Sequence, residues 1–458
     1  MSAQRRSRRK NESGAIIIHV AIALIALLAF TSFVIDYGVM WVSKRQAQNV
    51  ADAGALAGAL ALINDGGTPA VAILAGQHFA ANNPIWGQGN SNGNGNTTGN
   101  VIVTPSGASD NIPPCGTNPG CVRVDVFRNM PDRADPPVVR GNPLPTYFAQ
   151  LVGVTDQGVR ATATAETSGG RSIKCLLPFA IIDRWADNHD ENPDPTFFPK
   201  DPILSPGVEG WSANDEYRPA SGDLYIPPYN GNTNHTGWKV KADYGRQLIL
   251  KDGRPGNYSA GWANEVDLPD STGSQDYKWN IENCNKQPVG IASATEPCTA
   301  VDEPIGCVSV KTGVSQGPTS QGIGTLAKGL TGQDPSAEWD WTAKGPYSPT
   351  KDGAVVGGGG MSSPRIRPIV IIDINHYVGQ GCSGTTCVAK VANIVGFFVE
   401  GMCKDVFDRG DMDGGMICDD PTKDVVGRIV NLPSAFVVGA GTAVESSAAF
   451  IRIVRLVR

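Results

Sequence analysis

The sequence predicts an α+β protein: an N-terminal transmembrane helix that continues into a small α+β unit, then a loop-rich, β-dominated exported domain with disulfides. Residues Ala15 to Ile35 contain no Asp, Glu, Lys or Arg, and all ten cysteines come later in the chain. Gly (55) and Pro (33) are abundant among the 458 residues, and only 18% of the residues are charged. This composition favours short strands joined by turns over helical bundles.

Basic charge is concentrated at the N-terminus. The formal net charge is −6, yet the first ten residues hold five basic residues and no acidic one, so the rest of the chain is more acidic than the whole. Nucleic-acid phosphates require clustered Lys and Arg. The acidic body therefore excludes nucleic acid as an expected partner.

The uncharged run Ala15–Ile35 has the length of a membrane span. As a helix with a rise of about 1.5 Å per residue it extends about 32 Å, which matches the hydrocarbon core of a bilayer. The basic residues predict that residues 1–14 are a cytoplasmic tail and that the body lies outside the inner membrane. Signal-peptide apolar regions are only about 7–15 residues long, and Asn11 and Glu12 stand where a twin-arginine signal would continue with apolar residues. We therefore expect an uncleaved single-pass anchor in contact with membrane lipid.

The helical pattern continues beyond the span into an alanine-rich stretch that ends near Leu60. Small residues recur there at every fourth position, which lets two backbones approach closely. Two interpretations stay open: this face contacts the helix of a partner protein, or it packs on the chain's own domain. The candidate partner contacts are Ala47, Ala51, Ala55 and Ala59.

Three motifs in this region resemble the N-terminus of TadG-like proteins, which belong to the TadE/TadG group of Flp, or tight-adherence, pilus assembly. They are Gly14-Ala15-Ile16, Val34-Ile35-Asp36-Tyr37-Gly38 and the stretch from Arg45 to Ala59. The resemblance covers Gly14 to Ala61 and extends in weaker form to Ser168. It implies an inner-membrane protein with one N-terminal helix and a periplasmic body, which serves pilus biogenesis with other Tad membrane proteins.

Two departures from the family patterns bear on function. Pilins that a prepilin peptidase cuts carry Glu five residues after the cut, and after Gly14 this chain has His19 there. Larger TadG-like proteins end in a von Willebrand A-type domain with a D-x-S-x-S metal motif. After Asp373, this chain has Asn375 and Tyr377 at the two serine positions. We therefore expect neither processing at Gly14 nor that metal site.

The part of the chain beyond the span divides near Gly169-Gly170, into residues 36–170 and residues 171–458. The first region, TadG-like, should hold strands at Val101–Thr104, Val122–Arg128 and Val159–Thr167 and a helix at Pro145–Val152. The second region is rich in Pro, Gly, Asp, Asn and Trp. Its short apolar segments, among them Ile366–Asn375 and Val388–Glu400, predict strands of a β-rich domain rather than a βαβ sheet. Its last segment, Ala448–Val457, fits an edge strand or a surface helix.

The cysteines predict disulfides, because all ten lie in the part expected to face the oxidising periplasm and no C-x-x-C zinc pair occurs. Spacing suggests three local pairs: Cys115–Cys121, Cys382–Cys387 and Cys403–Cys418. It does not pair the other four: Cys175, Cys284, Cys298 and Cys307.

The sequence lacks the common catalytic motifs. It contains no G-x-S-x-G, H-E-x-x-H or G-x-x-x-x-G-K-[ST], and Gly322–Ala327 is only a degraded G-x-G-x-x-G. Asp-rich loops at residues 187–194 and 408–420 raise the alternative of calcium, but they depart from EF-hand spacing, so solvated turns are preferred. We therefore expect no catalytic, cofactor-binding or metal-binding residues and no enzyme activity.

The sequence thus predicts a membrane-anchored Flp/Tad pilus assembly or adhesion component that acts through protein–protein contacts. Its expected partners are other Tad membrane proteins, with a homo-oligomer as a further option. The alternative is an anchored periplasmic or surface hydrolase or glycan-binding protein. Tryptophans in polar loops, among them Trp339 and Trp341, would serve a glycan or protein surface, or fill a satellite core.

Overall fold

A computed structural model describes most of the chain. The described residues are 13–64, 69–87, 101–105, 120–128, 143–186, 224–229, 234–251, 262–271, 273–293, 295, 297–298, 306–312, 315–328, 334–343, 345, 353–379, 387–413, 422–432, 436–440 and 450–457. They belong to two compact units: unit 1 is Met1–Leu62, Thr68–Glu166 and Arg455–Arg458, and unit 2 is Ile63–Gly67 and Thr167–Val454. The division falls within strand β5 (Val159–Ile173), as does the boundary expected at Gly169-Gly170.

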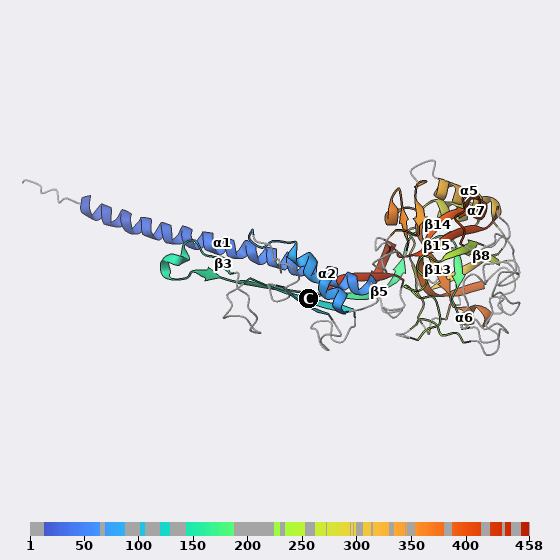
Figure 1. Cartoon of the computed structure of the whole chain (residues 1–458), viewed down its shortest axis with the longest axis horizontal. Helices are drawn as coiled ribbons and strands as arrows, with labels where there is room; N and C mark the ends of the chain where they lie inside the picture. Colours follow the sequence, from blue (N-terminus) through green and yellow to red (C-terminus); the bar gives the residue numbers. More distant parts are fainter. Residues whose placement is uncertain are drawn as a thin grey trace, which may run out of the picture. The chain divides into compact units, whose positions relative to one another are not determined.

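Unit 1 is built on helix α1 (Ser13–Asn64), and α2 (Pro69–Ala81) runs back along its C-terminal half (Figure 1). A Cβ atom on Gly54 would lie 3.1 Å from the backbone oxygen of Gly76, and one on Gly58 would lie 3.1 Å from that of Ala72. The helices are therefore antiparallel and almost in backbone contact, because glycine adds no side chain between them.

Part of a six-stranded sheet forms the second layer of unit 1. There β1 (Val101–Pro105), β2 (Cys121–Arg128) and the first part of β5 follow one another in antiparallel pairs. A Cβ on Gly58 would lie 2.9 Å from Val122 Cγ1, so the helix rests directly on the valine face of β2. The three strands expected here are confirmed, and unit 1 is a helix layer on a sheet layer.

The prediction of a helix at Pro145–Val152 was wrong. A hairpin takes its place and lies beside α1 (Figure 1): β3 (Leu144–Pro145), the 3-10 helix η3 (Ala149–Val152) and β4 (Asp156–Gln157). Gly153 ends η3 with φ 85°, a left-handed conformation that glycine adopts without strain. Pairing of Pro145 with Asp156 holds the ends extended, so only one short turn is helical.

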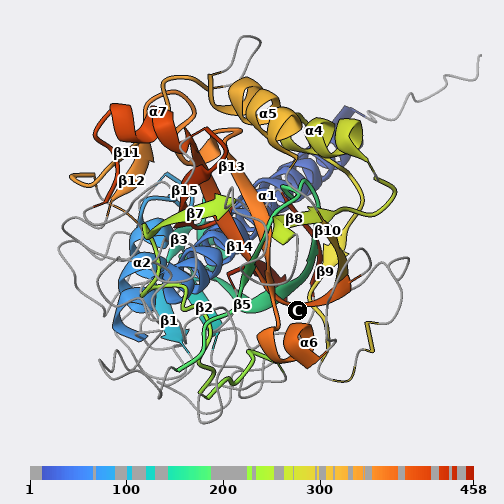
Figure 2. The same cartoon turned by 90° about the vertical axis from the view of Figure 1, so that its right-hand side faces the viewer.

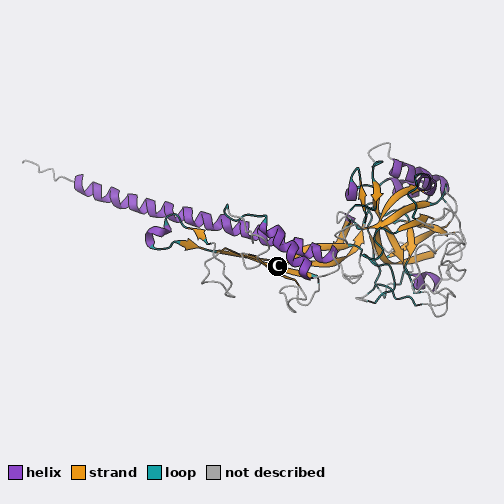
Figure 3. Cartoon of the chain, viewed as in Figure 1, coloured by secondary structure: helices purple, strands orange, loops and turns teal. Residues whose placement is uncertain are grey.

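Unit 2 is organised around two central strands, β13 (Ile366–Ile372) and β14 (Cys387–Met402), in a seven-stranded sheet (Figure 3). The strand order is β6-β13-β14-β10-β8, and β15 and β7 continue from β14. β6 and β13 are parallel, whereas the other pairs are antiparallel. A bridge between Phe179 and Glu265 joins the chain before β6 to β8, so the five-strand path closes on itself. The remaining bounds are β6 (Ala180–Ile182), β7 (Gln247–Lys251), β8 (Trp262–Asp267), β10 (Cys307–Thr312) and β15 (Val425–Val430).

Smaller elements complete unit 2. Strands β9 and β16 pair with the end of β5, and β17 also pairs with β5, so the last apolar segment is a strand rather than a surface helix. Helices α4 and α5 lie side by side, and α6 lies at the opposite side of the sheet (Figure 2). The bounds are α4 (Ser274–Glu282), β9 (Val289–Gly290), α5 (Gln316–Lys328), β11 (Glu338–Asp340), β12 (Ala354–Val356), η5 (Gly360–Ser362), α6 (Ile374–Gly379), α7 (Cys403–Asp408), β16 (Val437–Ala440) and β17 (Arg452–Val457).

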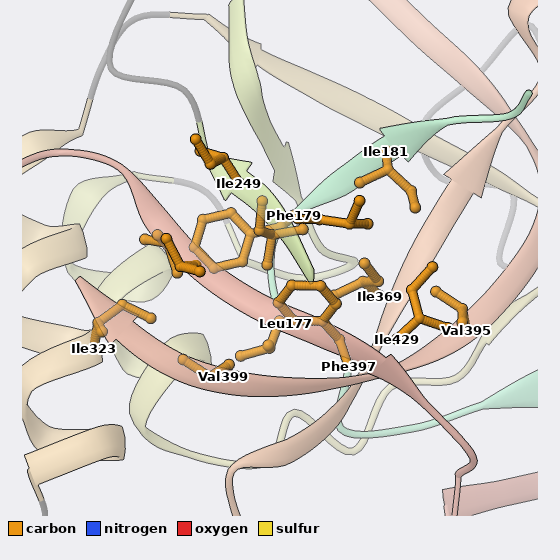
Figure 4. Packing of buried hydrophobic residues seen from close by; sticks show 14 of the residues in the cluster. Leu177, Phe179, Ile181, Ile249, Ile323, Ile369, Val395, Phe397, Val399 and Ile429 are labelled. Atoms are coloured by element: carbon orange, nitrogen blue, oxygen red, sulfur yellow. The ribbon is translucent and has the colours of Figure 1, made fainter. Parts of the chain in front are cut away.

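Apolar residues cover both faces of β13. Val370 and Ile372 belong to a hydrophobic cluster that includes residues of β6, β8, β10 and β14, whereas Ile369 and Ile371 belong to a second cluster. Figure 4 shows the second cluster, in which Ile369 and Phe397 lie with Phe179 and with Ile323 of α5. A strand buried on both sides needs an unbroken apolar run, which is the pattern that made this strand predictable.

Two disulfides in unit 2 join the four cysteines that spacing alone left unpaired: Cys175–Cys284 and Cys298–Cys307. Three further cysteines are also disulfide-bonded: Cys121, Cys387 and Cys403. The partners predicted for these three lie outside the described residues: Cys115, Cys382 and Cys418.

Candidate functional site

Helix α1 changes character at Asp36. In the preceding anchor segment, Ile16–Ile35, the large apolar side chains are 44 to 68% exposed, whereas Asp36 is only 8% exposed and begins a buried stripe. By length and composition α1 is the one helix among the described residues that fits a membrane span. A single apolar helix near the N-terminus thus fits a single-pass membrane anchor.

The four alanines predicted to contact a partner helix are buried within unit 1. Their side chains have no exposed surface, and Gly54 and Gly58 on the same stripe pack against Val124 and Val122 of β2. This is the second of the two interpretations that the sequence left open, because the small side chains bring α1 onto the chain's own sheet. The buried set is Ala47, Ala51, Ala55 and Ala59.

Asp36 ties the hairpin to the end of the anchor segment. Its carboxylate accepts hydrogen bonds from the backbone N–H groups of Tyr147 (2.7 Å), Phe148 (3.1 Å) and Ala149 (2.7 Å). Burial raises the pKa of Asp36, but these three N–H groups lower it, and the net pKa lies below the ordinary value. The carboxylate is therefore ionised at neutral pH. No motif in the sequence indicated its contact with the hairpin.

Unit 2 contains a cavity of about 980 Å³, here called the tryptophan cleft. Its walls come from α5, the residues around β11, the C-terminal end of β14 and the loop at residues 409–413. Two of the tryptophans that the sequence placed in polar loops meet here. The rings of Trp339 and Trp341 lie 5.5 and 4.9 Å from the guanidinium carbon of Arg428, and Trp341 is half exposed.

Arg428 is the centre of a buried ionic network in the tryptophan cleft. Its Nε donates to Glu400 Oε1 (2.7 Å), and its two terminal nitrogens donate to Asp413 (2.9 and 3.0 Å). Glu400 Oε2 accepts from Gln247 Nε2 (2.5 Å). Burial raises the pKa of Glu400, and the charge and hydrogen bond of Arg428 oppose this shift. The sequence signal for this network was a charged residue inside the apolar strand Val425–Val430.

Two aspartates of the acidic loop at residues 408–420 form ion pairs with arginines. Asp413 pairs with Arg428, and Asp411 pairs with Arg409 through a 2.8 Å contact. Asp419 and Asp420 lie outside the described residues. The other Asp-rich loop, residues 187–194, lies outside the described residues. Over the described part of the chain, no group of three or more His, Cys, Asp or Glu side chains is placed to hold a metal ion.

Two buried carboxylates follow the parallel strands β6 and β13. Asp183 accepts hydrogen bonds from the backbone N–H of Trp238 (3.0 Å) and the hydroxyl of Tyr225 (2.9 Å), whereas Asp373 accepts one from the hydroxyl of Tyr229 (3.0 Å). Burial, aided by the nearby charge of Asp373, raises the pKa of Asp183 to about 7 although its hydrogen-bond donors lower it. Asp183 is thus a group of the described part of unit 2 whose charge changes near neutral pH.

The raised pKa of Asp183 predicts that unit 2 loses stability as the pH rises. The folded state holds the proton up to about pH 7, whereas an unfolded Asp releases it near pH 3.9, so between these values the free energy of unfolding falls by up to about 1.4 kcal/mol per pH unit. We expect Asp183→Asn to flatten this slope between pH 5 and 7, because Asn stays neutral and keeps an acceptor oxygen. Urea unfolding of the full chain in detergent at several pH values measures it. An unchanged slope in Asp183→Asn would contradict the assignment.

Comparison with protein families finds a match in the N-terminal part of the chain. Residues 14–61 match the family model of Flp pilus-assembly TadE/G-like proteins, named Tad. The matched residues contain the anchor segment, Asp36 and the buried alanine stripe, so the resemblance inferred from the N-terminal motifs is confirmed for this region. Comparisons with curated proteins and with solved structures gave no significant match.

Proposed function

We propose that the protein is a membrane-anchored component of Flp/Tad pilus assembly or adhesion that acts through protein–protein contacts and is not an enzyme. The observation that carries this proposal is the Tad match over residues 14–61, which coincides with an exposed apolar helix. A helix whose apolar side chains are all exposed requires lipid or another apolar surface around it.

The compartment follows from charge and cysteine chemistry. Five basic residues precede the anchor segment, and this asymmetry favours a cytoplasmic N-terminus. The disulfides of unit 2 favour an oxidising compartment on the other side. We therefore place the chain in the bacterial inner membrane with its body in the periplasm.

Among the described residues, the arrangement of exposed and buried groups fits a function in protein contacts better than one in catalysis. The acidic side chains of the tryptophan cleft, Glu400 and Asp413, are bound by Arg428, and Asp183 and Asp373 are bound by tyrosine hydroxyls. These groups are therefore engaged in contacts within unit 2. The alanine stripe is already used inside unit 1, so partner helices would meet the anchor segment or the exposed side of α1 at Leu60.

The processing of the N-terminus tests this proposal. An assembly component keeps its basic tail and stays in the membrane, whereas a pilin loses its leader and leaves with the fibre. Because His19 stands where a pilin would carry Glu, we expect the membrane-purified protein to retain residues up to Gly14, apart from the initiating Met. N-terminal sequencing of the inner-membrane fraction, and of sheared fibres from the same cells, measures this.

The contrary results are specific. A mature chain that begins at Ala15, or recovery mainly in sheared fibres, would make the protein a pilin-like subunit. Deletion of the gene should also abolish surface fibres, and the full chain should restore them. Normal fibres after deletion would remove the assembly role while leaving the membrane anchor intact.

A further inference from the structure

We propose that the hairpin of residues 143–157, here called the interface hairpin, rests in the headgroup layer of the membrane and gives the protein a second lipid contact beside its anchor. The inference rests on the proposed function, in which the anchor segment stays in the bilayer. Three observations carry it: where the hairpin is fixed, what it exposes, and what surrounds it on α1.

The hairpin is fixed at the level where the span ends. Asp36 directly follows Ile35, the last residue of the anchor segment. Its carboxylate holds the N–H groups of Tyr147 and Ala149, each at 2.7 Å, and its backbone oxygen accepts from Gln157 Nε2 at 3.3 Å. One helical residue thus binds both arms of the hairpin. The headgroup layer is about 5–8 Å thick on each side of the hydrocarbon core, so a turn bound to the first residue beyond the core lies within it.

The turn of the hairpin exposes apolar surface at that level. Tyr147 and Val154, which flank η3, are 52% and 48% exposed. In water such exposure is a cost, whereas in a membrane interface a tyrosine ring meets acyl chains and its hydroxyl meets headgroups. In Figure 1 the curved end of the hairpin, which contains η3, lies beside α1.

Aromatic residues continue the same level around α1. Tyr37 and Trp41 are 52% and 50% exposed, and they follow Ile35 by about 3 and 9 Å along the helix axis. At about 100° per residue they point away from the side on which Asp36 binds the hairpin. The hairpin and Tyr37 therefore lie at the level of the headgroup layer on different sides of the helix, and Trp41 lies at its outer edge, which is the arrangement of an interfacial aromatic belt.

Basic charge follows directly above the belt. The guanidinium of Arg45 stacks on Trp41 at 4.1 Å from the ring centroid, and Lys44 Nζ donates to the backbone oxygen of Arg160 on β5. These two residues follow Ile35 by about 14 and 15 Å along the helix axis, beyond the headgroup layer. Apolar helix, aromatic belt and cations therefore follow one another along α1 from the hydrocarbon core to the water.

This contact has a mechanical consequence. A single transmembrane helix tilts and rotates with little restraint from the lipid itself. A hairpin that rests on the bilayer beside the helix restrains both motions, because the two contacts are held together by Asp36. Unit 1 would then present a fixed side to neighbouring proteins in the membrane plane.

The test measures the depth of single labels in nanodiscs that contain the full chain with zwitterionic and anionic phospholipid. An environment-sensitive fluorophore is attached to a new cysteine in Tyr147→Cys or Val154→Cys, under non-reducing conditions that keep the native disulfides. Leu74→Cys is the matched control, because Leu74 is an exposed apolar residue of unit 1. Its helix packs at Gly54 and Gly58, about 30 Å further along α1 than Asp36.

We expect lipids with a nitroxide near the headgroup to quench labels at positions 147 and 154 several-fold more than the label at position 74. Aqueous iodide should show the reverse order. Labels at 147 and 154 that behave like the label at 74 would overturn the inference. A label in Ile25→Cys separates the two proposals: quenching there by a deep nitroxide shows that the anchor holds, whereas its absence would overturn the anchor and the interface hairpin with it.

Discussion

Removal of the disulfide Cys175–Cys284 is expected to lower the free energy of unfolding of unit 2 by about 4.8 kcal/mol, from the chain entropy of the loop it closes. That loop spans 109 residues, whereas Cys298–Cys307 spans 9, for which the same relation gives about 2.6 kcal/mol. The longer loop matters more because its closure removes more conformations from the unfolded chain.

A buried cation depends on the same disulfide. The guanidinium of Arg367 donates from Nε to the backbone oxygen of Cys175 (2.8 Å) and from a terminal nitrogen to that of Asn283 (2.6 Å), next to Cys284. Burial lowers the pKa of Arg367 to about 10, so it is still charged at neutral pH. The disulfide holds two carbonyl groups where they bind this charge, and separating them would leave it without its partners.

The measurement compares two double variants of the full chain in detergent, Cys175→Ser/Cys284→Ser and Cys298→Ser/Cys307→Ser, by urea unfolding followed through tryptophan fluorescence. The first variant should lose clearly more stability than the second. An equal loss, or the reverse order, would contradict the loop-entropy argument. Since domains are typically stable by about 5–15 kcal/mol, the first variant is also expected to accumulate poorly in cells.

Local patterns in the sequence predicted the features that depend on one segment at a time. The anchor follows from an uncharged run, and β13 and β14 follow from apolar runs that are buried on both faces. Helix α5 was missed because its sequence holds Pro318 and three glycines, which are poor helix formers. It forms because Gly322 packs closely on Ile281 of α4: a Cβ there would lie 2.9 Å from Ile281 Cβ.

Contacts between distant segments were beyond the reach of the sequence. Cys175 and Cys284, or Asp36 and Tyr147, share no spacing rule that would bring them together. The alanine stripe shows the same limit, because small residues at every fourth position predict close packing without naming the surface that supplies it. The candidate site was therefore predictable as an anchor, but not in its hairpin or its tryptophan cleft.

A substitution in the tryptophan cleft is expected to have the second large effect on stability. Arg428→Ala should lower the free energy of unfolding of unit 2 by about 3–5 kcal/mol, the usual cost of removing one partner of a buried ion pair. Arg428 is 1% exposed and Glu400 5%, so the variant would leave a buried carboxylate without its countercharge. Trp339 and Trp341 would also lose the guanidinium that lies against both rings.

Arg409→Ala is the matched control, because Arg409 and Asp411 form an ion pair in the same cleft whose side chains are 49% and 50% exposed. Exposed pairs contribute about 0–1 kcal/mol, so the stability of this variant should remain close to that of the parent protein.

The pH dependence of the stability loss in Arg428→Ala separates the contribution of the charge from that of packing. Without Arg428 the pKa of Glu400, which burial already raises, rises further, so the folded variant keeps a proton that the unfolded chain releases above about pH 4. The loss of unfolding free energy caused by Arg428→Ala is therefore expected to be greater at pH 8 than at pH 5. Urea unfolding of the full chain at both pH values measures it. An equal loss at both pH values would show that packing of the arginine, rather than its charge, stabilises the cleft.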